Sequence, residues 1–354
     1  MHHHILKCLL LFSLLKFGEI SGEFSGLSDN IKEDLFAIYT HAALLERNIT
    51  REPVTPDKVE FVLFTENNPK NYTKIDPSNP TELNNTEVRI VFIIHGWLEN
   101  RGKEWYEDLK NAFLNKKEKS YYVVQVDWSE PALQGYMVSA YNTKDVGNIV
   151  GQLIVDLHKK YSVPLANILV VGHSLGGQIS GYVGRKVKES TNKKLARIVA
   201  LDPAGPLFIN RPENERLNKD DAEIVHVIHT NGGTFGFFLS CGTIDFFPNG
   251  GSTQTGCATV NLLDPTSIAE PVVCNHQRSW KYFIEAVEYP EEFQGRKCKT
   301  WASYLAKTLC DEEYAGMGDV DTKKTGEFYL TTNNESPYYK QRSLLERHFA
   351  FARM

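Results

Sequence analysis

Continuous apolar runs alternate with helix-like segments over most of the chain. Several of these runs end at a glycine or a proline, and strands buried on both faces have this character. Between them, residues 146–161 and 175–187 carry apolar side chains at helical spacing. This alternation predicts an α/β fold with a mostly parallel central sheet and helices on both faces. The runs that we expect to form strands are 88–97, 121–129, 167–174, 196–206 and 222–233.

The pattern is different before the first of these strands. Residues 27–85 are polar and irregular, and only 59–65 resembles a strand. At the N-terminus, an apolar run over Ile5–Leu15 precedes small residues. This run is shorter than the about 20 residues of a membrane-spanning helix, so it predicts a cleaved secretory signal over 1–22 rather than an uncleaved anchor. No later segment is long and apolar enough to span a membrane, and we expect a secreted, extracellular protein.

Composition narrows the possible partners. Apolar residues make up 42% and charged residues 23% of the 354 positions, close to the average of folded domains. The net charge is −5 and no basic stripe runs along the chain, so nucleic-acid binding has no support. Four N-x-S/T sequons fit an exported glycoprotein, and these candidate glycosylation sites are Asn48, Asn71, Asn84 and Asn334.

Secretion also affects how the cysteines are interpreted. Cys8 falls in the signal segment, which leaves five cysteines in the mature chain. In an oxidising compartment, this odd number indicates two disulfide bonds and one further thiol. No pair has the C-x-x-C spacing, so a zinc site is not predicted.

The sequence Gly172-His173-Ser174-Leu175-Gly176 fits the G-x-S-x-G pattern of a nucleophile. A buried strand comes before it and an amphipathic helix follows, which is the context that the pattern requires. A sharp strand-to-helix turn strains the backbone at the serine, and larger side chains in place of the glycines would collide. Although a tight turn can contain a serine by chance, this context favours Ser174 as a nucleophile.

A catalytic serine needs a base, and the base needs an acid that fixes its tautomer. Asp202 and Asp245 both follow Ser174, and chain order alone does not decide between them. Among the histidines, we interpret His226 and His229 as core residues of a strand, and His348 lies in a charged tail. His276 is the favoured base, because it sits in an expected loop next to Cys274 and ahead of an apolar helix.

His95-Gly96-Trp97 ends the first strong strand. A turn there would direct the Trp97 N–H toward the same crevice as the N–H of Leu175. Two such donors form an oxyanion hole, and each contributes about 2.7–4 kcal/mol in mutational tests. The alternative is a glycine turn beside a packed tryptophan.

Seven sequence blocks over roughly residues 55–340 resemble the pancreatic lipase family, and in particular its insect lipase and phospholipase A1 branch. The blocks are FIIHGW, VDWS, GHSLGGQISG, LDPAGPLF, VIHTNGG, DFFPNGG and CNHQRSWKYF. The resemblance implies an α/β-hydrolase fold with a catalytic domain over 23–340 and a tail over 341–354. It also implies a triad of Ser174, Asp202 and His276, an oxyanion hole at Trp97 and Leu175, and a structural role for Asp245.

The resemblance further implies two disulfide bonds. Cys257–Cys274 would close a surface lid, and Cys298–Cys310 would be the next bridge. Cys241 has no usual counterpart in the family, and it is either a free thiol near the substrate cleft or a partner for another chain.

No cofactor is required for this chemistry, but the family has a structural calcium site. Its positions match Glu213, Arg216 through its carbonyl, Asn218 and Asp221. The family has an acidic residue where this chain has Asn218, and the loss of one negative ligand weakens a calcium site. A solvated charged loop is the alternative interpretation.

Two departures from the digestive enzymes concern the substrate. We expect no C-terminal β-sandwich and therefore no colipase partner. The 16-residue lid over 258–273 and the loop 231–244 are short, and in this family short loops accompany phospholipase A1 members. We therefore favour phospholipase A1 activity, with triacylglycerol or galactolipid hydrolysis as the alternative. A catalytically silent yolk-type lipid-binding protein is disfavoured because all three triad residues are present.

The predicted lid keeps an apolar edge that could touch a lipid surface. Its members are Leu262, Leu263, Ile268, Val272 and Val273.

Overall fold

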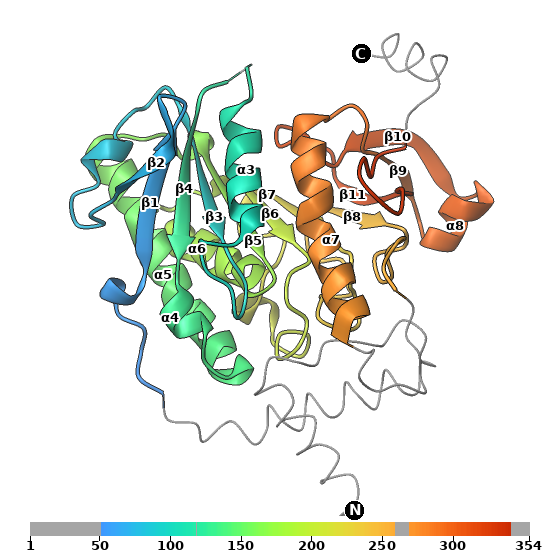
Figure 1. Cartoon of the computed structure of the whole chain (residues 1–354), viewed down its shortest axis with the longest axis horizontal. Coiled ribbons are helices and arrows are strands. Elements are labelled where there is room, and N and C mark those ends of the chain that lie inside the picture. The colour runs from blue at the N-terminus through green and yellow to red at the C-terminus, as the bar shows by residue number, and fades with distance from the viewer. Residues whose placement is uncertain (1–50, 118, 259–268, 341–354) are drawn as a thin grey trace, which may run out of the picture.

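One sheet of eleven strands runs through the described part of the chain (Figure 1). The structure is a computed structural model that describes residues 51–117, 119–258 and 269–340. Adjacent strands are parallel through the whole centre of the sheet, which confirms the predicted α/β class. In spatial order the parallel strands are β11 (Gly326–Leu330), β8 (Ile244–Pro248), β7 (Ala222–Ile228), β6 (Leu195–Leu201), β5 (Ile168–His173), β3 (Arg89–Ile94) and β4 (Tyr121–Asp127).

Antiparallel strands extend the sheet at both ends. β1 (Glu60–Thr65) pairs with β4, and β2 (Asn68–Lys74) pairs with β1 at the edge. At the other end, β9 (Gln294–Cys298) pairs with β11, and β10 (Cys310–Gly316) pairs with β9. The short helix α8 (Trp301–Ala306) connects β9 to β10.

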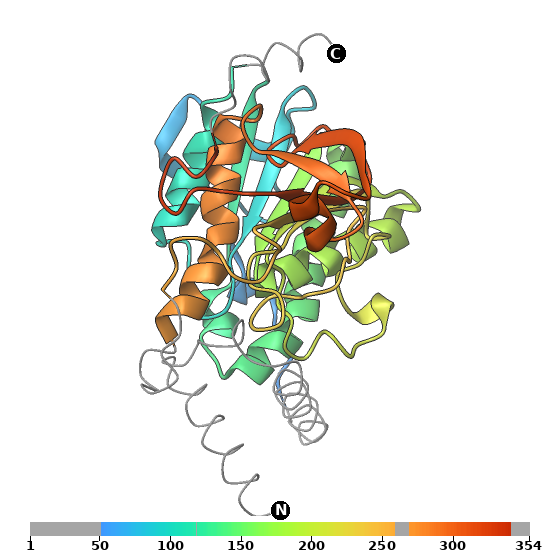
Figure 2. The same ribbon diagram turned by 90° about the vertical axis from the view of Figure 1, so that its right-hand side faces the viewer.

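Helices cover both faces of the sheet (Figures 1 and 2). One hydrophobic core packs α5 (Tyr136–Tyr161) and α6 (Leu175–Thr191) against one face. A second core packs α3 (Glu104–Leu114) and α7 (Ala269–Glu288) against the other. Along β3, Phe92 belongs to the first core, and Val91 and Ile93 belong to the second. Because both faces of β3 are buried, its sequence is continuously apolar.

The remaining elements are short. They are α4 (Ser129–Ala132) and the 3-10 helices Pro56–Lys58, Thr81–Leu83, Leu165–Asn167 and Glu213–Glu215.

The structure begins two helices, α5 and α7, earlier in the chain than the sequence pattern predicts. α5 begins ten positions before the expected 146, because the buried positions of its first turns are polar. Ser139 Oγ and Asn142 Nδ2 both donate to the carbonyl of Pro131, at 3.0 and 3.2 Å. The sequence pattern did not predict the edge strand β2 for a different reason. Every side chain after Asn68 is exposed, so the strand shows no apolar alternation.

Several sequence predictions lie outside the described residues: the signal segment 1–22, the sequon at Asn48, the lid residues 259–268 and the tail 341–354. The boundaries of the catalytic domain at 23 and 340 therefore stay a prediction. Among the helices of the described ranges, none has the length and hydropathy that a membrane crossing requires.

Candidate active site

Ser174 lies on a sharp turn between β5 and α6, at the carboxyl end of the parallel sheet. Its backbone has φ 56° and ψ −119°, a conformation that an L-residue adopts only under strain. Side chains on the flanking glycines would overlap backbone atoms. A Cβ on Gly172 would strike the carbonyl of Gly176, and a Cβ on Gly176 would strike that of Ile94. The G-x-S-x-G pattern is thus a steric requirement of this turn.

Asp202 follows β6 and is completely buried. Its Oδ1 accepts hydrogen bonds from the N–H groups of Thr230 and Asn231, at 2.8 and 3.0 Å. Its Oδ2 accepts from Nδ1 of His276 at 2.5 Å. The two N–H donors hold the carboxylate in one orientation, and the carboxylate fixes the proton of His276 on Nδ1.

His276 lies inside α7 and not in the loop that the sequence suggested. The sequence pattern did not predict this part of the helix, because some of its inward-facing residues are polar and form hydrogen bonds with other segments. Asn275 Oδ1 accepts from the N–H of Gln254 at 2.6 Å, and Arg278 donates to the carbonyls of Thr255 and Asn334. A helix anchored in this way holds the imidazole more firmly than a loop would.

The ring of His276 lies 4.6 Å from the ring of His173, the residue before Ser174, and 5.6 Å from Phe235. Burial lowers the pKa of His276, and the hydrogen bond with Asp202 opposes part of this change. The imidazole is therefore neutral at neutral pH, with its proton on Nδ1 and a lone pair on Nε2. This is the state that a general base requires.

The loop after β3 packs directly on the serine turn. A Cβ on Gly96 would lie 2.8 Å from Cβ of Ser174. The next residue, Trp97, donates its indole N–H to the carbonyl of Gln134 at 2.8 Å. Leu98 has φ 56°, so strained backbone occurs in this loop as well. The predicted donors Trp97 and Leu175 therefore belong to two segments in contact.

Glu99 is a residue of this loop that the sequence motifs did not single out. Its Oε2 accepts the N–H of Gly96 at 2.8 Å, and its Oε1 accepts the indole N–H of Trp105 at 3.3 Å. Burial alone would raise the pKa of Glu99, but His173 and the Gly96 N–H lower it to about 2. A half-buried carboxylate thus fixes the peptide between His95 and Gly96, one unit before the N–H of Trp97. A lone glutamate outside any motif offers no sequence signal for this contact.

A second aspartate–histidine pair lies nearby. Oδ1 of Asp245 accepts from Nε2 of His229 at 2.8 Å, and the carbonyl of Phe237 accepts from Nδ1 at 2.8 Å. Burial lowers the pKa of His229, but these two acceptors outweigh it and raise the pKa above its ordinary value. Since both ring nitrogens are bonded to oxygen atoms and the ring stacks on Phe247, this histidine has no nitrogen left for a serine. The geometry agrees with a structural role for Asp245.

His226 is a buried residue of β7, as predicted, and stacks on Phe246 at 4.8 Å. Cys241 is buried and not part of a disulfide. Its thiol lies within 4.8 Å of ligand atoms of His229 and Asp245, but both nitrogens of that histidine are already engaged. Burial raises the pKa of the Cys241 thiol well above its ordinary value, which disfavours the thiolate, and the side chain belongs to the first hydrophobic core.

Both expected disulfides are present in the structure. Cys257–Cys274 ties the end of one loop to α7, two positions before His276. Cys298–Cys310 joins β9 to β10. Three of the sequon asparagines are exposed, namely Asn71, Asn84 and Asn334.

The four residues of the expected calcium site lie together against α6, but nitrogen donors occupy the space between their oxygen atoms. Asn218 Nδ2 donates to the carbonyl of Glu213, and Arg185 Nη1 donates to the carbonyl of Arg216 and to Asp221. These residues, as arranged, do not fit a divalent cation.

The model of a family described as Lipase matches residues 27–338. The chain belongs to this lipase family. Its fold is accordingly the α/β-hydrolase fold, and its Ser-Asp-His arrangement is that of a carboxylic ester hydrolase.

Three relatives show the range of proteins in the family. The chain is 34% identical to horse (Equus caballus) pancreatic triacylglycerol lipase over 330 residues, which cover 85% of this chain and 70% of that protein. It is 32% identical to phospholipase A1 2 of the wasp Vespa affinis over 302 residues, which cover 81% of this chain and 86% of that protein. It is also 32% identical to inactive pancreatic lipase-related protein 1 of the dog (Canis lupus familiaris) over 320 residues, which cover 82% of this chain and 67% of that protein.

Proposed function

We propose that this chain is a secreted enzyme that hydrolyses acyl esters of glycerolipids, with Ser174 as nucleophile, His276 as base and Asp202 as acid. The hydrogen bond between Asp202 and His276, next to the strained serine turn, is the observation that carries the proposal. It leaves the lone pair of Nε2 for the proton of the Ser174 hydroxyl. Attack of Ser174 Oγ on the ester carbonyl then forms a tetrahedral oxyanion.

The N–H groups of Trp97 and Leu175 stabilise this oxyanion. His276 next returns its proton to the alcohol that leaves, and an acyl group stays on Ser174. A water molecule, deprotonated by His276, attacks the acyl-enzyme and releases the fatty acid. The cycle restores the neutral imidazole and the free hydroxyl.

Glu99 has a positioning role in this scheme. Its carboxylate holds the N–H of Gly96, which restrains the backbone one peptide unit before the N–H of Trp97. An oxyanion donor contributes most when it is oriented before the reaction begins. The charge of Glu99 also faces His173, which packs on the ring of the proposed base.

We favour a phospholipid substrate, cleaved at its first acyl position. The disulfide Cys257–Cys274 encloses only 16 residues and the loop between β7 and β8 is short, and in the family that the sequence resembles short loops accompany phospholipase A1 members. On that second loop, Phe238 and Leu239 are each 48% exposed. Exposed apolar side chains beside the site favour contact with a lipid surface. Triacylglycerol or galactolipid hydrolysis is the alternative.

Secretion is part of the proposal. Its support is the signal-like pattern at the N-terminus together with two disulfide bonds, which persist in an oxidising compartment.

A regiochemical assay tests the substrate. The protein is incubated with vesicles of a phosphatidylcholine that carries a different acyl chain at each position, and separately with a triglyceride emulsion; Ser174→Ala is the control. Release of the first-position acid from the phospholipid, absent in the control, is expected. Hydrolysis of the triglyceride alone would contradict the substrate assignment. Turnover of neither lipid, nor of a soluble p-nitrophenyl ester, would show a silent lipid-binding protein instead.

A further inference from the structure

The loop from Glu213 to Asp221 packs against α6, the helix that begins next to Ser174. Tyr182 of this helix donates its hydroxyl to the carbonyl of Glu215, and Gln178 accepts the N–H of Leu217 at 2.8 Å. The loop therefore supports the helix that carries the nucleophile. What holds this loop together bears on the stability of the whole active site.

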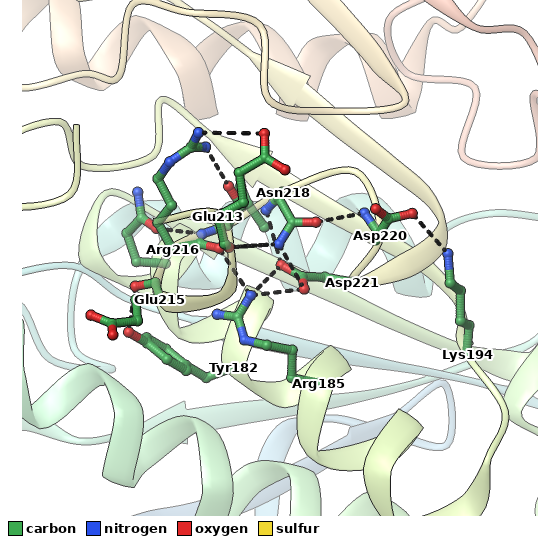
Figure 3. Close-up of polar contacts among 11 residues, drawn as sticks. Tyr182, Arg185, Lys194, Glu213, Glu215, Arg216, Asn218, Asp220 and Asp221 are labelled. Carbon is green, nitrogen blue, oxygen red and sulfur yellow. Dashed lines mark hydrogen bonds and ion pairs between the residues drawn. The ribbon is translucent and has the colours of Figure 1, made fainter. Parts of the chain in front are cut away.

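Asn218 is buried at the centre of the loop (Figure 3). Its Nδ2 donates to the carbonyl of Glu213 at 2.8 Å and lies 3.4 Å from the carbonyl of Arg216. It also lies 3.3 Å from Oδ1 of Asp221. One amide nitrogen thus faces oxygen atoms of the three other residues that the family resemblance names as calcium ligands.

The orientation of this amide is determined by its other end. Oδ1 of Asn218 accepts the N–H of Asp220 at 2.8 Å. A flipped amide would turn its NH₂ group toward that N–H and its oxygen toward three acceptor atoms. The nitrogen therefore belongs where the structure has it.

Arg185, from the same helix, supplies the positive charge. Its Nη1 donates to both carboxylate oxygens of Asp221, at 2.8 and 2.9 Å, and to the carbonyl of Arg216 at 2.9 Å. The side chain of Asp221 is 2% exposed and that of Arg185 is 15% exposed, so this ion pair is largely shielded from water. The guanidinium and the amide together satisfy every oxygen that a cation would coordinate here.

The other acidic side chains of the loop do not face this centre (Figure 3). The carboxylate of Glu213 is 72% exposed and faces Arg216, and that of Asp220 is 63% exposed and faces Lys194. A calcium ion needs six to eight oxygen ligands, several of them charged, and N–H groups directed at its position repel it.

We propose that Asn218 and Arg185 take the place of the family's structural calcium ion, so that this chain holds the loop without a divalent cation. The amide joins the oxygen atoms that an ion would bridge, and the guanidinium neutralises Asp221. Neither the stability nor the activity of the protein then depends on calcium. This inference concerns the scaffold and holds whichever lipid is the substrate.

Thermal unfolding of the full-length secreted protein in calcium chloride and in EDTA provides the first test, with equilibrium dialysis against radioactive calcium beside it. We expect the same midpoint in both buffers and no bound calcium at millimolar concentration. A midpoint that falls in EDTA and returns with calcium, or one calcium ion bound per chain, would overturn the proposal.

Asn218→Asp provides the second test, because a carboxylate there can keep the bond to the Asp220 N–H and still offer an oxygen to a cation. Without the amide donors, the variant should unfold several degrees lower in EDTA, and calcium chloride should raise its midpoint. Asn214→Asp adds the same charge at an exposed position of the loop, and it should show no calcium response. An Asn218→Asp variant as stable as wild type in EDTA would contradict the role of the amide. The dialysis of wild type remains decisive if the variant does not fold.

Discussion

Replacement of Asp202 by asparagine reverses one hydrogen bond at the centre of the proposed triad. Oδ1 of Asp202 faces two N–H donors at 2.8 and 3.0 Å, so the amide NH₂ of an asparagine cannot occupy that side. It must face Nδ1 of His276, which lies 2.5 Å from Oδ2. The NH₂ group then donates to Nδ1, and the imidazole carries its proton on Nε2.

A histidine in this tautomer cannot accept the proton of Ser174. The comparable substitution in a serine protease lowers kcat by about 10⁴, although the geometry is retained. At 1.36 kcal/mol for each tenfold change, this is about 5.5 kcal/mol in the activation barrier. We expect a loss of this size for Asp202→Asn.

Asp245→Asn is the matched control, because it makes the same change in the neighbouring aspartate–histidine pair. Asp245 accepts from His229 and from the N–H groups of Cys241 and Gly242 in a buried setting. Breaking a buried ion pair costs about 3–5 kcal/mol of stability. The control should therefore unfold at a lower temperature and keep most of its kcat.

The assay is hydrolysis of a p-nitrophenyl ester, with rates expressed per folded protein and unfolding followed by circular dichroism. Asp202→Asn should lose activity and Asp245→Asn should lose stability. An Asp202→Asn enzyme within tenfold of the wild-type kcat would refute the assignment of the acid. A folded Asp245→Asn enzyme with the larger loss of kcat would transfer that role to Asp245.

Three further predictions concern single groups. Because burial lowers the pKa of His276 and the base acts when neutral, kcat/KM should rise with pH and reach half its maximum below pH 6.5; a midpoint above that value would contradict the burial argument. Glu99→Gln weakens the anchor of Gly96 and should lower kcat about tenfold, or 1.4 kcal/mol, with KM unchanged, whereas an unchanged kcat would exclude its positioning role. Cys241 should resist a thiol reagent in the native mature protein and react once when it is unfolded; rapid native labelling would show that the thiol is accessible.

The sequence pattern predicts the parallel centre of the fold well, because burial on both faces produces uninterrupted apolar strands such as β3. It fails where buried positions are polar. The first turns of α5 bury Ser139 and Asn142 through bonds to Pro131, and such bonds depend on a neighbour that periodicity does not reveal. The same applies to α7, whose buried Asn275 placed His276 in an apparent loop.

The candidate site was predictable to the extent that its residues lie in motifs. Ser174 and the flanking glycines follow from local sterics, and the sequence offers Asp202 and Asp245 as candidates for the acid, between which chain order does not decide. The choice between them depends on which histidine has a free nitrogen, and that is a property of the folded chain. The sequence did not single out Glu99, because its hydrogen bonds with Gly96 and with Trp105 of α3 form only in the folded chain.

Loss of the Ser174 hydroxyl is the most direct test of the whole account. Family membership does not settle catalysis, since one of the relatives reported above is described as inactive. The measurement is hydrolysis of p-nitrophenyl butyrate by the wild type, by Ser174→Ala and by Ser190→Ala, a control at the far end of the same helix. The account predicts activity in the wild type and the control, and none above background in a folded Ser174→Ala protein. A Ser174→Ala variant as active as wild type would contradict it.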